Sequence, residues 1–170
     1  MGIENNNLIK SLKQDYSNNS KKSFIILFFY LTMHICYENK IRVYLALLSL
    51  LKYFVFLLLR IDAQISYEAQ IGDDIRLPHS GNGVVISSDA IIEDHQTIYH
   101  QVTIGINEKF PKEDRKVIIR KNCYLSVGCK IINCEISEGC KIGPNAVAYR
   151  DLAPNTTLVC NCMEIKRKKE

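Results

Sequence analysis

The sequence predicts a mainly β protein: a parallel β-helix of hexapeptide repeats, preceded by a short α-helical N-terminal region. Two observations predict this fold class. Branched aliphatic residues recur every six positions from residue 65 onward, and residues 23–61 are apolar and contain no glycine or proline. A period of six fits neither a helix nor an alternating strand, but one hexapeptide can supply a short strand and a turn.

The repeat defines both the coils and their interior. Its first positions are Ile65, Ile71, Leu77, Ile86, Ile92, Ile98, Ile104, Ile119, Leu125, Ile131, Ile136 and Ile142. Small or aliphatic residues, including Cys123, Cys129 and Cys140, follow four positions after many of these. Three hexapeptides can close a triangular coil of about 18 residues whose first and fifth positions face inward. We therefore interpret these three cysteines as small hydrophobic core residues.

Two insertions interrupt the repeat. Leu77 and Ile86 are nine positions apart instead of six, and Ile104 and Ile119 are fifteen apart. Extra residues in a solenoid are extruded as loops, and loops carry function more often than the coils do. We expect the longer loop, residues 107 to about 115, to leave the coil just after His100, so that both loops lie beside the same corner.

Composition limits the function classes. A net charge of +4 on 170 residues is too mild to indicate nucleic-acid binding, and no nucleic-acid-binding motif is present. The polar start predicts no cleavable signal peptide, so we expect the seven cysteines to be free thiols in the cytoplasm. Cys160 and Cys162 have no second pair at zinc spacing, and we expect no metal site.

Four segments follow from these patterns. Residues 1–22 are polar and predicted to be loosely ordered, 23–61 form an apolar helical segment, 62–158 form the β-helix, and 159–170 form a basic tail.

The apolar segment divides at residues 37–40 into two predicted helices. The second is near the ~20 residues that a membrane span needs, but Lys52 interrupts it and Arg42 and Arg60 flank it. Three alternatives remain open: the helices pack on the β-helix or on sister subunits, lie on a membrane surface, or span a bilayer.

The register places two histidines on one corner. His79 follows Leu77 by two residues and His100 follows Ile98 by two, so the coil count stacks them one strand spacing apart, ~4.8 Å. Histidine exchanges protons near neutral pH, which makes the pair a candidate acid–base site. The alternatives are two exposed turn histidines without a role, or a metal pair. His95, on another turn, is interpreted as structural.

The stretch "IGDDIRLPHSGNGVVISSDAIIEDHQTIYHQVTIG", residues 71–105, resembles the hexapeptide-repeat acyltransferases with a left-handed β-helix. Within them it is most similar to the serine acetyltransferase branch, and sugar O-acetyltransferases of surface-polysaccharide pathways share the same segment. The resemblance covers residues 63 to about 158. It implies acetyl transfer from acetyl-CoA by a homotrimer, with each active site between neighbouring β-helices and His79 as the general base.

The resemblance also implies further site residues. His100 shares the catalytic corner, and the backbone around Gly105 would stabilise the oxyanion. Val127 and Pro144 are candidate pantetheine contacts. Lys166 and Arg167 either pair with cofactor phosphates or form a solvated end. The loop residues Asp114, Arg115 and Lys116 fall where the family contacts its acceptor.

Three positions depart from the serine acetyltransferase pattern. Pro78 stands where the family has an aspartate before the catalytic histidine, and Lys116 stands where its Asp-Arg-His loop motif has histidine. The family's aspartate that orients the imidazole would fall at Gln64, with Asp62 two residues away. A sugar hydroxyl needs no partner for an ammonium group, whereas serine does. The sequence therefore predicts a surface-polysaccharide sugar as acceptor. The alternatives are serine and a non-catalytic β-helix scaffold, and the predicted location is the cytoplasm or the inner face of the membrane.

Overall fold

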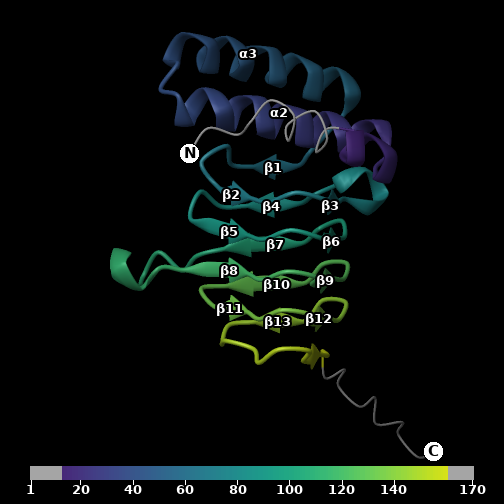
Figure 1. Ribbon diagram of the computed structural model, residues 1–170, viewed down its shortest axis with the longest axis vertical. Helices are drawn as coiled ribbons and strands as arrows, with labels where there is room; N and C mark the ends of the chain where they lie inside the picture. The colour runs from purple at the N-terminus through teal and green to yellow at the C-terminus, as the bar shows by residue number, and fades with distance from the viewer. Residues whose placement is uncertain (1–12, 161–170) are drawn as a thin grey trace, which may run out of the picture.

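The computed structural model describes residues 13–160 (Figure 1). Two helices, α2 (Lys21–Glu38) and α3 (Arg42–Leu59), form a hairpin that lies across one end of a stack of β-coils. The coils then run away from the helices toward the C-terminus.

The coils form three parallel sheets, here called sheets A, B and C. Sheet A contains β1 (Gln64–Ile65), β4 (Val85–Ile86), β7 (Thr103–Gly105), β10 (Lys130–Ile132) and β13 (Val147–Ala148). Sheet B contains β2 (Gln70–Ile71), β5 (Ala90–Ile92), β8 (Val117–Ile119) and β11 (Glu135–Ile136). Sheet C contains β3 (Ile75–Arg76), β6 (Gln96–Ile98), β9 (Tyr124–Leu125), β12 (Lys141–Ile142) and β14 (Thr157–Leu158). The chain visits the sheets in the order A, B, C, so the predicted parallel β-helix is confirmed.

The observed register is the one that the hexapeptide count predicts. Ile65 pairs with Ile86 in sheet A, and Ile98 pairs with Leu125 in sheet C. The repeat's first positions fill the interior, and those from Ile86 to Ile142 are at most 3% exposed.

The inward cysteines are buried as predicted. Cys123, Cys129 and Cys140 are each at most 2% exposed. Burial raises the pKa of the Cys123 thiol to about 11 and that of Cys129 to about 12, because a thiolate would lose its hydration in the interior of the β-helix. These thiols therefore act as packing groups.

Helix α2 closes the end of the β-helix. Ile26, Leu27 and Tyr30 join the core of the coils. The Tyr30 hydroxyl donates to the carbonyl of Ala69 at 2.9 Å and accepts the amide of Ile71 at 3.0 Å, so it satisfies backbone groups of the first coil.

The N-terminal polar segment contributes specific contacts. Residues 13–18 are helical. The Asn19 amide side chain donates to the carbonyl of Ile75 and accepts the amide of Leu77, at 2.8 and 2.7 Å. It thereby bonds with the free edge of β3 on either side of Arg76, as a neighbouring parallel strand would. The four-segment division of the chain otherwise stays a prediction.

The two insertions leave the β-helix at different corners. The first forms a short 3₁₀ turn, η1 (Pro78–Gly81), between sheets C and A. The second runs from 106 to 116 between β7 and β8, between sheets A and B, and contains the 3₁₀ turn η2 (Lys112–Asp114). The hexapeptide count predicted that this loop leaves just after His100. It leaves instead at the next corner, because β7 lies between His100 and the insertion.

Candidate active site

His79 and His100 meet at the corner between sheets C and A. Their ring centroids are 4.8 Å apart, with the planes at 71°. The residues come from successive coils, which the register of β3 and β6 holds side by side. The structure thus brings the two predicted catalytic residues together.

The backbone of η1 presents His79 outward. His79 and Ser80 have φ of 54° and 63°, in the left-handed region that costs a residue with a side chain of order 1–3 kcal/mol. Gly81 follows with φ of 61°, and a Cβ there would lie 3.1 Å from the Cδ1 of Ile26. Glycine at 81 therefore allows the turn to pack directly against α2.

Helix α2 also holds η1 through hydrogen bonds. The buried Ser23 hydroxyl donates to the carbonyl of Leu77 at 2.7 Å. The Ser20 and Ser80 hydroxyls lie 3.4 Å apart, and Ser20 caps α2 by accepting the amide of Ser23. The position of His79 consequently depends on the start of α2, a link between residues 54 positions apart that no local sequence pattern indicates.

Aromatic rings line the same corner. Tyr99 lies 5.9 Å from His79 and 5.3 Å from Tyr124, measured between ring centroids. The hydrogen bond with Tyr99 raises the pKa of Tyr124. The Nδ1 atom of His100 is enclosed and has no hydrogen-bond partner among the described residues. This corner therefore offers one exposed imidazole, supported by a second ring with a free nitrogen.

The predicted cofactor residues divide between two places. The amide of Gly128 donates to the carbonyl of His100, and the amide of Asn145 donates to that of Val127, at 3.1 and 2.9 Å. One column along successive coils thus contains His79, His100, Val127 and Pro144. Gly105 ends β7 at the other corner of sheet A, near the loop. Lys166 and Arg167 lie outside the described residues. The cofactor roles of all five stay predictions.

The loop residues predicted to bind the acceptor are not beside His79 in this chain. The Arg115 guanidinium donates to the carbonyls of Phe110 and Glu108, at 2.9 and 2.6 Å, and so braces the loop from within. Asp114 is exposed, and its carbonyl accepts the Asn133 side chain at 3.2 Å.

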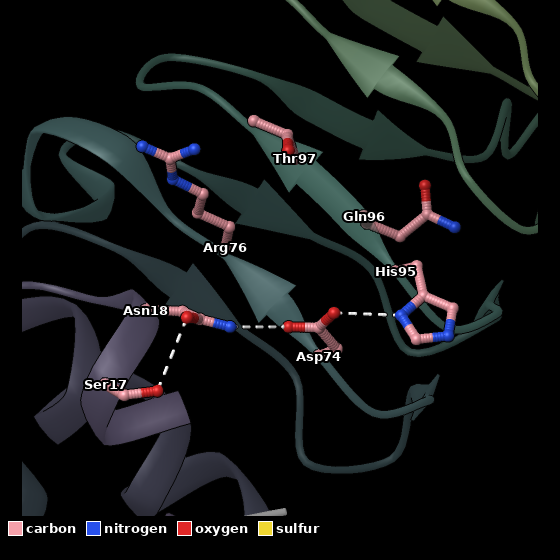
Figure 2. Close-up of a pocket in the computed structure, with 7 residues that line it drawn as sticks. All are labelled: Ser17, Asn18, Asp74, Arg76, His95, Gln96 and Thr97. Atoms are coloured by element: carbon pink, nitrogen blue, oxygen red, sulfur yellow. Dashed lines mark hydrogen bonds and ion pairs between the residues drawn. The ribbon is translucent and has the colours of Figure 1, made fainter. Parts of the chain in front are cut away.

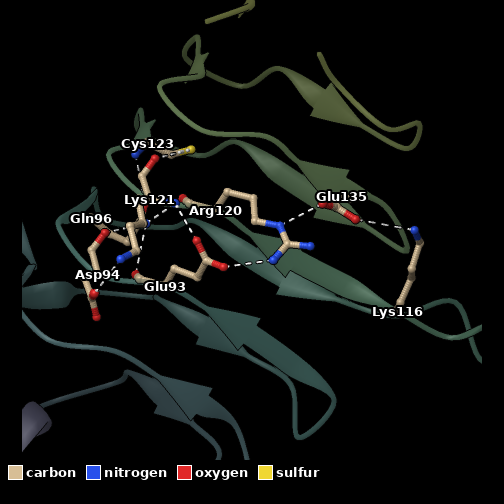
Figure 3. A network of polar contacts seen from close by, with 8 residues as sticks. All are labelled: Glu93, Asp94, Gln96, Lys116, Arg120, Lys121, Cys123 and Glu135. Carbon is tan, nitrogen blue, oxygen red and sulfur yellow. Dashed lines mark hydrogen bonds and ion pairs between the residues drawn. The ribbon is translucent and has the colours of Figure 1, made fainter. Parts of the chain in front are cut away.

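Lys116 lies at the base of the loop, in a network of charges along sheet B (Figure 3). Its ammonium is 3.7 Å from Glu135 and 3.6 Å from Asp151. Arg120 donates to Glu135 at 2.8 Å and to Glu93 at 2.9 Å, which links three successive coils. These pairs are 15 and 27 residues apart in sequence, so no local signal could have revealed them.

A polar hollow of about 470 Å³ lies at the third corner, between sheets B and C (Figure 2). Asp74 accepts a hydrogen bond from Asn18 and pairs with His95, each at 2.8 Å. The hydrogen bond with His95 lowers the pKa of Asp74. The contact between His95 and Asp74 fits the interpretation of His95 as a structural residue.

An apolar groove of about 720 Å³ separates α3 from sheet A. Phe56 and Leu57 line it on the helix side, and Ile65 and Val85 line it on the sheet side. Lys52 also lines it, with its ammonium 5.2 Å from the centre of the Phe56 ring. Burial lowers the pKa of this lysine. Neither hollow includes His79 or His100.

Comparison with known proteins now adds to this geometry. No family model matches the chain. A curated serine acetyltransferase of Buchnera aphidicola is 35% identical over 92 residues, which cover 54% of this chain and 35% of that protein. The structure of soybean serine acetyltransferase complexed with serine has a TM-score of 0.67 and 28% identity, and covers 81% of this chain and 54% of that one. The chain resembles the serine acetyltransferases.

The similarity to serine acetyltransferases extends into the helices. The structure of the Brucella abortus enzyme in complex with coenzyme A matches 90% of this chain and 65% of that one. Its TM-score is 0.75 at 21% identity, a likeness of fold. These neighbours confirm the left-handed β-helix and the short helical N-terminal region. The chain spans about a third of the length of the Buchnera protein and about half of the soybean chain.

Proposed function

We propose that this protein is an acetyl-CoA-dependent O-acetyltransferase in which His79 is the general base. The observation that carries the proposal is the stacked pair His79 and His100 on one corner of a β-helix like that of the serine acetyltransferases. His79 takes the proton of the acceptor hydroxyl as its oxygen attacks the thioester carbonyl. The carbon–sulfur bond then breaks, and coenzyme A leaves as the thiol after it regains a proton.

The two imidazoles have different tasks in this scheme. His79 is exposed and free to meet the acceptor, whereas His100 is half-buried beneath it. The edge of one ring packs against the face of the other, so His100 limits the rotation of His79. A general base held in place contributes about 10²–10⁴-fold to the rate.

The column of residues that continues from His100 toward the C-terminal coils suits the co-substrate. Val127 and Pro144 provide an apolar strip that leads away from His79 along the coil axis, where the pantetheine arm of acetyl-CoA would lie. Lys166 and Arg167, outside the described residues, are the candidates to pair with its phosphates. The Brucella structure holds coenzyme A on a fold of this kind, which supports the assignment.

We further propose a homotrimer in the cytoplasm. His79 projects from a corner rather than into a hollow, while the loop with Asp114, Arg115 and Lys116 leaves from a different corner. A neighbouring subunit could bring its loop to the His79 corner and complete a cleft. The cysteines among the described residues are free thiols, which fits a reducing compartment.

L-serine is the first candidate acceptor, because the matched relatives and structures are serine acetyltransferases. A sugar hydroxyl is the second candidate, and contacts of this chain favour it. Pro78 stands before the base, Asp62 accepts the amide of Gly83 at 2.8 Å, and Lys116 is engaged with carboxylates. A serine ammonium would need an acid that these residues do not supply at the corner.

The test is consumption of acetyl-CoA by the full chain with L-serine, or with a panel of sugars and sugar nucleotides. Turnover with serine supports the first acceptor, and turnover only with sugars supports the second. Without turnover on any hydroxyl acceptor, the protein is a β-helix scaffold and the proposal fails. His79→Ala should abolish whichever turnover is found.

A further inference from the structure

Helix α3 carries a large apolar face that no described part of the chain covers. None of its 18 residues is buried, although its mean hydropathy of 1.9 would suit a membrane span. The exposed side chains recur at helical spacing along one side: Val43, Leu47, Leu50, Phe54 and Leu58. Their exposed fractions run from 57% to 82%. A contiguous apolar patch of this kind marks an interaction site.

The opposite side of α3 faces the rest of the molecule. Leu45, Leu48, Lys52, Phe56 and Leu59 are half-buried and turned toward α2 and the coils. The helix is therefore seated as part of the fold and presents only its outer side. About 27 Å of helix, at 1.5 Å per residue, lies across the end of the coil stack, and its outer side points away from the coils (Figure 1).

The charges around this face have one sign. From residue 39 to residue 61 the sequence contains Lys40, Arg42, Lys52 and Arg60 and no acidic residue. Arg42 and Arg60 are exposed at the two ends of the helix. Tyr44 and Tyr53, at 64% and 63% exposure, flank the apolar row, as tyrosines do at membrane interfaces.

These observations decide between two occupants. A second copy packed through the same face in a two-fold arrangement would place arginines near arginines, with no acid on the helix to pair with them. An anionic lipid surface instead offers hydrocarbon to the row of Leu and Phe, and phosphates to the basic ends. Lys52 and the seating on α2 favour a helix that lies on the bilayer over one that crosses it.

We propose that α3 docks this protein peripherally on an anionic membrane surface. The outer side of α3 enters the headgroup boundary, while Arg42 and Arg60 contact lipid phosphates. The coils then project away from the membrane. This docking does not depend on the proposed acetyltransferase activity, and its test requires no turnover.

The test is flotation of the full chain with vesicles of phosphatidylcholine alone, or with one quarter phosphatidylglycerol. We expect binding to the anionic vesicles to be at least about tenfold tighter, because each basic residue adds attraction to anionic lipid. High salt should weaken the binding. Arg42→Gln with Arg60→Gln should remove the preference for anionic lipid, and the triple variant Leu47→Gln, Leu50→Gln, Leu58→Gln should abolish binding.

The matched control is Val147→Gln with Tyr149→Gln. These side chains are also apolar and exposed, at 51% and 65%, but they lie on a coil far from α3. The control should bind vesicles like the unchanged protein, and circular dichroism should show each variant folded.

Three results would overturn the proposal. One is equal or absent binding to both kinds of vesicle. Another is failure of the unchanged protein to bind vesicles, together with a mass by light scattering that is halved in the triple variant. This would show that a second copy covers the face. The last is resistance of the bound protein to carbonate extraction, which would show a spanning helix.

Discussion

The imidazole rings of His79 and His100 lie 4.8 Å apart, edge to face, although the residues are 21 positions apart. One coil of about 18 residues and a three-residue insertion account for that separation. The stacking is therefore a consequence of the hexapeptide register. The inserted residues leave the coil as a turn, so the strands on either side of them stay in register and the two histidines stay stacked.

Replacement of His79 tests the assignment of the base. We expect His79→Ala to lower acetyl-CoA turnover by about 10²-fold or more, because the acceptor hydroxyl would lose the group that removes its proton. Turnover is measured as release of the coenzyme A thiol under saturating acceptor.

His95→Ala is the matched control for that substitution. His95 is also an exposed histidine with positive φ on a β-helix corner, but it pairs with Asp74 on a different edge. We expect its turnover to stay within about twofold of the unchanged protein, since it touches no reacting group in this scheme. A similar loss in both variants would show that His79 acts through the fold.

Removal of the Ser23 hydroxyl tests the link between α2 and the turn η1, which carries His79. Ser23→Ala leaves the buried carbonyl of Leu77 without its donor, which should cost about 1–3 kcal/mol of unfolding free energy. We also expect turnover to fall, because η1 loses an anchor two residues before His79. Urea unfolding and thioester assays measure the two effects.

Ser49→Ala provides the comparison. Its exposed hydroxyl donates to the carbonyl of Leu45 within α3, so its loss leaves no buried group unsatisfied. We expect a change within about 0.5 kcal/mol. Equal effects of the two substitutions would mean that the Ser23 contact does not anchor the turn.

The sequence predicts the β-helix because each hexapeptide by itself determines which of its residues face the interior. Each hexapeptide places one aliphatic residue inward, so the register of Ile65 with Ile86 and the burial of Cys123 follow from counting. To predict the corner from which the long loop leaves, one must also know that β7 lies between His100 and the loop. That prediction was wrong.

Other features depend on contacts between distant residues. Asn19 bonds with β3 across more than fifty residues, and Arg120 joins two carboxylates on different coils. The sequence has no period that relates these positions. The corner with His79 and His100 could therefore be placed from the repeat, whereas the support of its turn by α2 could not.

The cysteines should separate into reactive and unreactive groups. Cys160 is exposed and Cys36 is half-buried. Burial raises the pKa of Cys123 and Cys134 to about 11 and that of Cys129 to about 12. Since the thiolate is the nucleophile, a disulfide reagent at pH 8 should label Cys160 first and the inward cysteines only after unfolding. Mass spectrometry of the labelled peptides checks the order, and early labelling of Cys129 would contradict the burial.

Asp15 should make stability depend on pH. Burial raises its pKa from 3.8 to about 6, and the nearby charges of Asp73 and Asp74 add to the rise. One of its carboxylate oxygens has no hydrogen-bond partner among the described residues. Because the folded-state pKa is above the unfolded one, its contribution to stability is fully present below about pH 4 and is lost as the pH rises through 6.

Asp15→Asn removes that loss. We expect the variant to be more stable than the unchanged protein by about 1–2 kcal/mol above pH 6, less than the same shift would give at a fully enclosed carboxyl. The two proteins should converge below about pH 4, where the native carboxyl is protonated. Urea unfolding at several pH values measures the difference, and Asp89→Asn, at an exposed carboxylate, serves as the control. A stability gap that does not change with pH would show that Asp15 acts through packing, not through its charge.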